Sequence, residues 1–96
     1  MIYIYTLSYC NYCHKALDLL KQLKIPYKNI IVDKNKEKIK LKNKMKTFPQ
    51  IFMKNNDNKM IKLGGYDDFY NIVKKLCKNG KINILLNNEK CGKECL

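Results

Sequence analysis

Residues 2–16 decide the fold, and they read IYIYTLSYCNYCHKA. Residues 2–6 are β-branched or aromatic, which predicts a strand. After Asn11 the apolar residues recur at steps of three and four, which predicts a helix that Pro26 ends. These apolar positions are Cys13, Ala16, Leu17, Leu20 and Leu23. A strand followed directly by a helix, with Cys-x-x-Cys at their junction, is therefore the starting unit.

Further strands and helices are predicted after this unit. They are a strand at 27–32, a lysine-rich helix after Asp33, strands at 50–54 and 60–63, a helix ending near Gly80 and a short helix at 82–86. Asp33 is the expected N-cap of the lysine-rich helix. The sequence NNDN at 55–58 is typical of a turn, so the two strands around it are predicted to form a hairpin.

The predicted order, β-α-β-α-β-β-α, indicates an α/β fold. A strand–helix–strand start pairs the first two strands in parallel through a right-handed crossover. The hairpin then adds antiparallel strands, which gives a four-stranded mixed sheet flanked by helices. The 96 residues suit one small domain, with 46% hydrophobic and 29% charged residues. We expect that domain at residues 1–86 and a polar, Cys-containing tail at 87–96.

The charge and the N-terminal residues bear on partners and location. The formal net charge is +12 and Arg is absent, whereas nucleic-acid readers depend on Arg for bidentate contacts. We interpret the lysines as a bias of the coding sequence and expect no nucleic-acid partner. The first seven residues are too few to span a bilayer and carry no basic leader, so no membrane association is expected. A cytoplasmic monomer is the prediction.

Cys10 and Cys13 form the motif that carries chemistry. Cys10 falls at the start of the predicted helix, where free N–H groups and the helix dipole favour a thiolate. Cys13 lies one turn further on the apolar face, so the pair suits a reversible disulfide in which Cys10 attacks and Cys13 resolves. A zinc site is the alternative, with His14 or the tail cysteines as further ligands. The strand–helix context favours the redox interpretation.

The chain resembles the glutaredoxins of the thioredoxin superfamily, dithiol type, over residues 1 to about 86. Three segments carry the resemblance: CNYCHKA at 10–16, TFPQIF at 47–52 and GGYDD at 64–68. They occur in the order and spacing of that family. The resemblance implies a thioredoxin-like fold, a Cys10–Cys13 redox disulfide and glutathione as cosubstrate.

The resemblance also implies how glutathione is bound. The implied contacts are Tyr12, Thr47, Phe48, Pro49, Tyr66, Asp67 and Asp68. Pro49 is expected to be cis, so that the Phe48 backbone pairs with the cysteinyl part of glutathione. Gly64 and Gly65 are expected to let the backbone approach the ligand closely. In the alternative interpretation, the two Asp residues only cap the following helix.

Two departures from the family's pattern affect these expectations. Position 11 is Asn where many dithiol members have Pro, and some relatives without that proline hold a [2Fe–2S] cluster through the first Cys. Cys10 is the cluster ligand in that alternative; no metal is expected otherwise. Position 7 is Leu where the family often has a Lys for the glycine carboxylate of glutathione. Lys36 and Lys40 are the candidates to replace it.

The predicted function is that of a glutathione-dependent thiol–disulfide oxidoreductase acting on protein disulfides and protein–glutathione mixed disulfides. Ribonucleotide reductase is a client that the family shares widely. The alternatives are a glutathione-ligated [2Fe–2S] carrier and a thioredoxin-like electron donor. No chemistry is predicted for Cys77, Cys91 and Cys95, and a regulatory thiol pair in the tail is the alternative for the last two.

Overall fold

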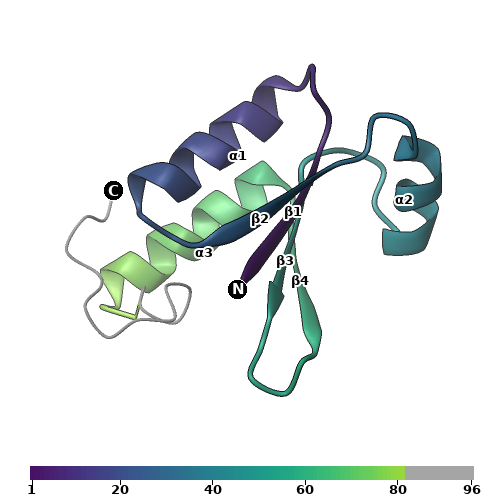
Figure 1. The fold of residues 1–96 in the computed structure, drawn as a ribbon. Helices are drawn as coiled ribbons and strands as arrows, with labels where there is room; N and C mark the ends of the chain where they lie inside the picture. Colours follow the sequence, from purple (N-terminus) through teal and green to yellow (C-terminus); the bar gives the residue numbers. More distant parts are fainter. Residues whose placement is uncertain (82–96) are drawn as a thin grey trace.

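A four-stranded mixed sheet forms the centre of the computed structural model, which describes residues 1–81 (Figure 1). The elements are β1 (Ile2–Thr6), α1 (Asn11–Gln22), β2 (Tyr27–Ile31), α2 (Lys36–Asn43), β3 (Gln50–Lys54), β4 (Met60–Gly64) and α3 (Tyr66–Lys78). The order predicted from the sequence is confirmed over this range. The predicted helix at 82–86, the domain boundary at 86 and the tail lie outside the described residues.

The strand order in the sheet is β2-β1-β3-β4. β1 pairs in parallel with β2 and antiparallel with β3, and β3 pairs antiparallel with β4, so the predicted parallel pairing of the first two strands and the predicted hairpin are both confirmed. The β1–β3 ladder pairs Tyr5 with Gln50. This register places the chain that follows β1 next to the chain that precedes β3. Cys10 and the segment before Gln50 therefore meet at one end of the sheet.

The core lies between the sheet and helices α1 and α3, which cover the same face (Figure 1). Ile2, Ile4 and Ile51 point into it from the strands and are fully buried. The helices contribute buried residues at the spacing expected of an apolar face: Ala16, Leu19, Leu20, Phe69 and Val73. Burial of these side chains is the main favourable term that holds α1, and with it Cys10, against the sheet.

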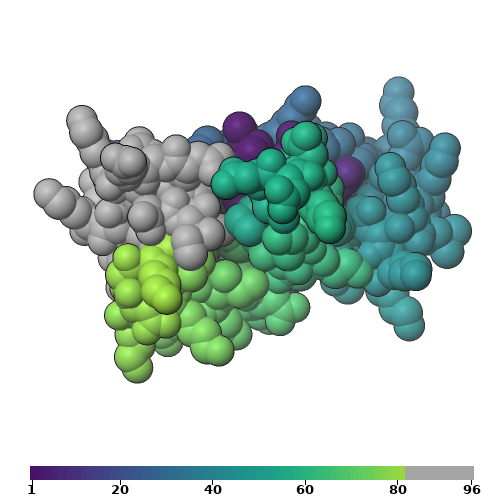
Figure 2. Space-filling model, turned by 90° about the horizontal axis from the view of Figure 1, so that it is seen from below, coloured from purple at the N-terminus to yellow at the C-terminus, as the bar shows by residue number. Residues whose placement is uncertain are grey.

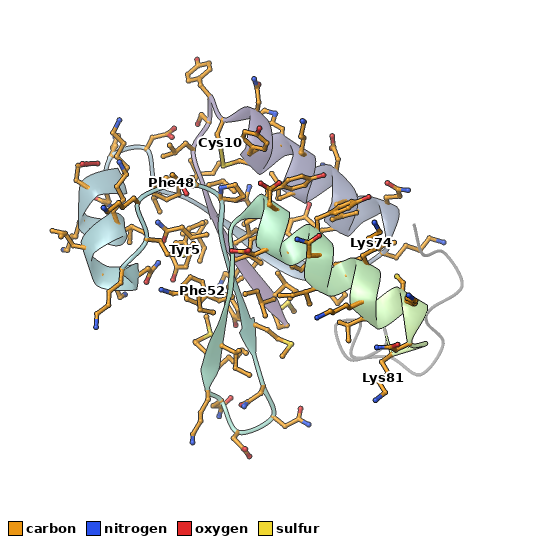
Figure 3. The ribbon with its side chains drawn as sticks, turned by 180° about the vertical axis from the view of Figure 1, so that it is seen from behind. Tyr5, Cys10, Phe48, Phe52, Lys74 and Lys81 are labelled. Atoms are coloured by element: carbon orange, nitrogen blue, oxygen red, sulfur yellow. A yellow bond between two sulfur atoms is a disulfide. The ribbon has the colours of Figure 1, made fainter. Side chains whose placement is uncertain are left out.

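The other face of the sheet carries aromatic side chains. Successive residues of a strand point to opposite faces, so Tyr5 and Phe52 lie away from the helices α1 and α3. Their rings meet edge to face, with centroids 5.8 Å apart (Figure 3). α2 buries none of its residues and stands at one end of the molecule, as the space-filling view shows in blue (Figure 2).

The prediction that Asp33 is the N-cap of α2 is wrong. The cap residue is Asn35, and its side chain makes no capping hydrogen bond. Asp33 instead accepts hydrogen bonds from Ser8, which lies 25 positions earlier in the chain. A carboxylate that takes two strong donors from a neighbouring loop is not available to the amides of the following helix.

No helix in residues 1–81 combines the length and the apolar character needed to cross a bilayer.

Candidate active site

Cys10 is the N-cap residue of α1. Its backbone is extended, with φ −140° and ψ 107°, and its sulfur lies 3.1 Å from the backbone nitrogen of Cys13, which donates to it. A Cys at this position receives one of the amides that a helix start leaves without a partner. In the reduced protein, the same amide and the positive end of the helix dipole favour a thiolate on Cys10.

Cys13 is fully buried on the apolar face of α1, whereas Cys10 is partly exposed. The two are joined by a disulfide with 5.1 Å between their Cα atoms, inside the usual range for such a bond. The burial difference matches the prediction from helical spacing. A reagent from solution therefore reaches Cys10 more readily than Cys13.

Ser8 anchors the loop between β1 and α1. Its backbone N–H donates to Asp33 Oδ1 at 2.8 Å, and its hydroxyl donates to Asp33 Oδ2. The Ser8 carbonyl oxygen lies 3.1 Å from His14 Nε2. The Ser8 hydroxyl and then its amide, which favour the ionised carboxylate, lower the pKa of Asp33, and Lys36 adds a smaller effect in the same direction.

Phe48 and Pro49 lie beside the reactive sulfur. Cys10 Sγ is 3.8 Å from the Phe48 carbonyl oxygen, and Figure 3 labels both residues at this end of the sheet. The Phe48–Pro49 peptide bond is cis, as the resemblance implied. Phe48 precedes β3 and so lies beyond the last pair of the β1–β3 ladder, Tyr5 with Gln50.

The side chain of Gln50, the first residue of β3, holds the 45–49 segment in place. It is fully buried, and its side-chain nitrogen donates to the carbonyl oxygens of Met45 and Thr47 at 3.4 and 3.3 Å. Its side-chain oxygen accepts from Asn43 Nδ2 at 2.8 Å. One buried amide thus ties the end of α2 and the 45–49 segment to β3. The sequence analysis missed this role, because Gln50 stood there only as the first residue of a strand.

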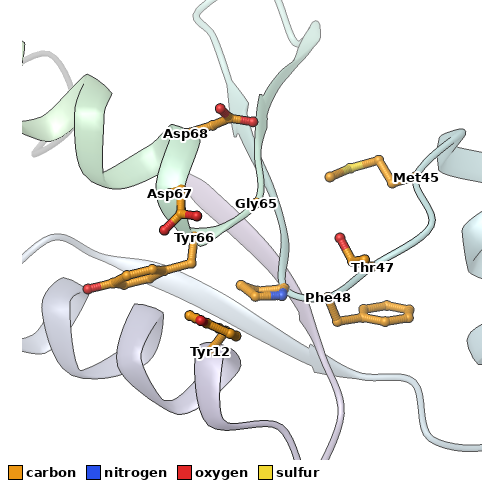
Figure 4. Close-up of a pocket in the computed structure, with 9 residues that line it drawn as sticks. Tyr12, Met45, Thr47, Phe48, Gly65, Tyr66, Asp67 and Asp68 are labelled. Carbon is orange, nitrogen blue, oxygen red and sulfur yellow. The ribbon is translucent and has the colours of Figure 1, made fainter.

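A cavity of about 450 Å³ lies between this segment and the start of α3 (Figure 4). Its lining includes all seven residues predicted to bind glutathione: Tyr12, Thr47, Phe48, Pro49, Tyr66, Asp67 and Asp68. Met45 and Gly65 complete the lining. Met45 was missed, since it belongs to no motif and only the return of the chain from α2 brings it here.

The rings of Tyr12 and Tyr66 belong to the lining of the cavity, and the Tyr70 ring lies next to Tyr66 outside that lining. Tyr12 and Tyr66 have ring centroids 6.0 Å apart, and Tyr66 and Tyr70 are separated by the same distance. Lys15 Nζ lies 5.1 Å from the centroid of the Tyr12 ring, within the range of a cation–π contact. Tyr12 is 55% exposed, so its ring presents a large apolar surface at the mouth of the cavity.

The two glycines before α3 have different roles. Gly64 has φ +102°, and a Cβ there would lie 2.5 Å from Asp68 Oδ2. Gly65 is the N-cap of α3, with φ −85°, and a Cβ there would meet only the Pro49 carbonyl oxygen at 3.6 Å. Gly64 therefore makes room for the side chain of Asp68, and of the two glycines only Gly65 belongs to the lining of the cavity.

No lysine belongs to the lining of this cavity as residues 1–81 form it. Lys40, one of the two candidates for the glycine carboxylate, pairs with Glu37 at 3.0 Å. Lys36 lies near Asp33 and lowers its pKa slightly. Leu7 is also outside the lining.

Metal ligands do not cluster in the described part of the chain: no group of three or more His, Cys, Asp or Glu side chains is suitably placed there. Cys10, which the iron–sulfur alternative requires, is bonded to Cys13 in this structure. Cys77 is half-buried and packs against the core near the end of α3. Cys91 and Cys95 lie outside the described residues.

Comparison with known proteins gives consistent matches. A family model described as Glutaredoxin matches residues 2–57. Glutaredoxin 1 of Rickettsia bellii is 37% identical over 95 residues, which cover 92% of this chain and 88% of that protein. The solution structure of a glutaredoxin from Brucella melitensis has a TM-score of 0.63 and 31% identity, and the match covers 88% of this chain and 86% of that one.

A buckwheat glutaredoxin, solved as a complex with glutathione, has a TM-score of 0.64 and 22% identity. The match covers 90% of this chain and 76% of the buckwheat chain. At this identity the likeness concerns the fold. Together with the sheet order and the placement of the helices, it confirms the expected thioredoxin-like fold.

Proposed function

This chain belongs to the glutaredoxin family of thiol–disulfide oxidoreductases, and from that premise we propose that it uses glutathione to reduce protein disulfides and protein–glutathione mixed disulfides. One observation carries the proposal. The Cys10 sulfur lies at the start of α1, within 3.1 Å of an amide donor, and beside the Phe48 edge of a cavity that brings together acidic side chains, aromatic rings and the start of α3.

The chemistry of the cavity supports glutathione as the ligand. Glutathione carries an ammonium and a carboxylate on its γ-glutamyl end. Asp67 and Asp68 provide negative charge for the ammonium, and the first amides of α3 suit the carboxylate. The backbone of Phe48, beyond the end of its ladder, suits short β-like pairing with the cysteinyl part. Such a pose brings the ligand sulfur toward Cys10.

The proposed reaction begins with the Cys10 thiolate. It attacks the glutathione sulfur of a protein–glutathione mixed disulfide, forms a Cys10–glutathione disulfide and releases the protein thiolate. The thiolate of a second glutathione then attacks the glutathione sulfur on Cys10. This step releases oxidised glutathione and regenerates the Cys10 thiolate, which the Cys13 amide stabilises.

A protein disulfide takes the dithiol route. The Cys10 thiolate attacks one sulfur of the client and forms a mixed disulfide, and the Cys13 thiol, after losing its proton, attacks Cys10 and releases the reduced client. The product is the Cys10–Cys13 disulfide that the structure contains. Two glutathione molecules then reduce it in two exchange steps. Cys13 is buried but within one helical turn of Cys10, which suits a resolving thiol.

Paired substitutions of the two cysteines test this assignment. Cys10→Ser is expected to abolish deglutathionylation of a model protein–glutathione disulfide, and Cys13→Ser is expected to retain it while losing dithiol reduction. Both variants are assayed with glutathione, glutathione reductase and NADPH. Retained activity in Cys10→Ser overturns the role of Cys10, and complete loss in Cys13→Ser overturns the monothiol route.

Mass spectrometry tests the cosubstrate separately. Oxidised glutathione is added to the reduced Cys13→Ser protein, and an adduct on the Cys10 peptide is expected. If the variant forms no adduct and the Cys10–Cys13 disulfide of the unsubstituted protein is reduced by a thioredoxin reductase, the protein is instead a thioredoxin-like donor. We further propose that the activity belongs to the cytoplasm, since a reducing compartment keeps the pair in its dithiol form between reactions.

A further inference from the structure

The loop between β1 and α1, residues 7–10, is short, and one residue in it has all its polar groups engaged. Ser8 donates from both its backbone N–H and its hydroxyl to the Asp33 carboxylate, and its carbonyl oxygen meets His14 Nε2. Cys10 lies two residues further on. The direction in which the chain enters Cys10 is therefore fixed by contacts that neither cysteine makes.

Asp33 is well placed to hold this loop. It follows β2 closely, and the backbone N–H of Val32 donates to the Thr6 carbonyl oxygen at 2.9 Å, which extends the pairing of the two strands to the residue next to Asp33. Val32 is buried. The carboxylate thus projects from a rigid strand end toward Ser8, and it is kept ionised there, as the lowered pKa of Asp33 indicates.

Asp33 is exposed, so these contacts are not needed to satisfy a buried charge. Two donors from one residue on one carboxylate define an orientation more sharply than a single hydrogen bond, and bonds to a charged acceptor are among the stronger ones. The arrangement is that of a clamp between the end of β2 and the loop that carries the nucleophile.

We infer that Asp33 is a positioning residue for the nucleophile: through Ser8 it holds Cys10 in the N-cap conformation in which the Cys13 amide stabilises the thiolate. The inference rests on the proposed role of Cys10. It adds a residue that lies outside the cavity and outside the segments that resemble the family, and that acts through another residue.

The direction in which the pKa of the Cys10 thiol changes when Asp33 is removed distinguishes a positioning role from a purely electrostatic one. The negative charge of Asp33 by itself opposes a nearby thiolate, so removing the charge alone would lower the pKa of the Cys10 thiol. Loss of the clamp has the opposite effect, because Cys10 leaves the Cys13 amide and its pKa rises. Tyr9 in the loop, His14 on α1 and Lys36 on α2 also carry charged or titratable groups near Ser8 or Asp33, and none of them is changed in the test.

The test measures the thiolate on Cys10 in Asp33→Ala and Ser8→Ala. Each reduced full-length protein is alkylated with iodoacetamide over a range of pH, and mass spectrometry follows the Cys10 peptide. We expect alkylation near pH 6 to slow by about three- to tenfold in both variants, with the midpoint of the pH profile moved upward. The double variant is expected to be no slower than Asp33→Ala, since Asp33→Ala already removes both hydrogen bonds, including the hydroxyl bond that Ser8→Ala removes.

Asn29→Ala is the matched control. Asn29 accepts a hydrogen bond of 2.6 Å from the hydroxyl of Thr6, the last residue of β1, so it joins the same two strands through β1 and not through Ser8. This variant is expected to change thermal stability without changing the Cys10 pH profile. Ser8→Ala removes one exposed hydroxyl and is expected to fold even if Asp33→Ala does not.

An unchanged or faster alkylation of Cys10 in the clamp variants, with the control unchanged, overturns the inference. That result would leave the proposed function intact. Failure of the proposed function has a different signature, which is retained deglutathionylation in Cys10→Ser.

Discussion

Asp67 is a residue whose charge we expect to act on the ligand rather than on the fold. It lies in the first turn of α3 and lines the cavity, and no described residue pairs with it. Replacing this carboxylate by an amide, as in Asp67→Asn, should therefore change the free energy of unfolding only slightly. Any effect of neutralising it should appear in binding.

Asp67→Asn is expected to raise the KM for a glutathionylated substrate about two- to fivefold with kcat nearly unchanged. The physical reason is the loss of one exposed charge–charge interaction, which is worth about 0.2–1 kcal/mol. Steady-state kinetics of the coupled assay measure both constants. Asp57→Asn, the same change in the β3–β4 turn, is the control. A lower kcat at unchanged KM would contradict a binding role.

Gly64 illustrates a conformational constraint at the same scale. Gly64→Ala is expected to lower the free energy of unfolding by about 2–3 kcal/mol, because a Cβ is strained at φ +102° and meets the Asp68 carboxylate. Gly80→Ala separates the two causes, since Gly80 has φ +68° with nothing within 4 Å and should cost about 1 kcal/mol. Urea unfolding measures both, and equal losses would exclude the contact with Asp68 as a cause.

At the scale of elements, the 45–49 segment depends on one buried amide from β3. Gln50→Ala is expected to lower the free energy of unfolding by about 2–3 kcal/mol, because Asn43 and the carbonyl oxygens of Met45 and Thr47 lose a partner. Asn43→Ala removes one of these bonds and should cost about 1 kcal/mol. Chemical denaturation measures both; a loss in Asn43→Ala as large as in Gln50→Ala would show that Gln50 does not act through several partners.

The three helices within residues 1–81 bury different numbers of their side chains. α2 buries no residue, whereas α3 buries Phe69 and Val73 and α1 buries four residues. Amide protons of α2 are therefore expected to exchange at least about tenfold faster than those in the middle of α1 and α3. Hydrogen exchange followed by mass spectrometry or NMR checks this order. Equal protection of the three helices would mean that α2 unfolds only with the whole domain.

What the sequence predicts well is local. The bounds of β1 and β3 follow from their composition, and the apolar spacing places Cys13 in the core. The residues proposed to contact glutathione were predicted through motifs, and the structure gathers all seven around one cavity. The contacts that hold the site were missed or misplaced. Asp33 was interpreted as a helix cap because its partner, Ser8, is remote in the chain. The sequence pattern around Gln50 does not indicate that its side chain is buried and bonded to the 43–47 segment.

At the scale of the whole molecule, the net charge of +12 is the largest long-range feature. The cavity itself has acidic residues and no lysine in its described lining, so attraction of anions comes from the field of the surrounding surface. Such a field acts on approach rates and weakens as salt shortens the Debye length.

Alkylation of reduced Cys10 measures this field. The rate with anionic iodoacetate, divided by the rate with neutral iodoacetamide, is expected to fall several-fold between about 0.01 and 0.5 M salt. The division removes any effect of salt on the thiolate itself. A ratio that stays constant would mean that the positive charge does not reach the nucleophile.

The strand order β2-β1-β3-β4 has a consequence for how copies of this protein behave at high concentration. Within residues 1–81 no further strand pairs with the outer edges of β2 and β4, and open edges of this kind can template pairing between chains. Lys28 on β2 and Lys62 on β4 put a positive charge on each edge. Two molecules that met along these edges would bring like charges together, so part of the lysine content protects the sheet from extending into aggregates.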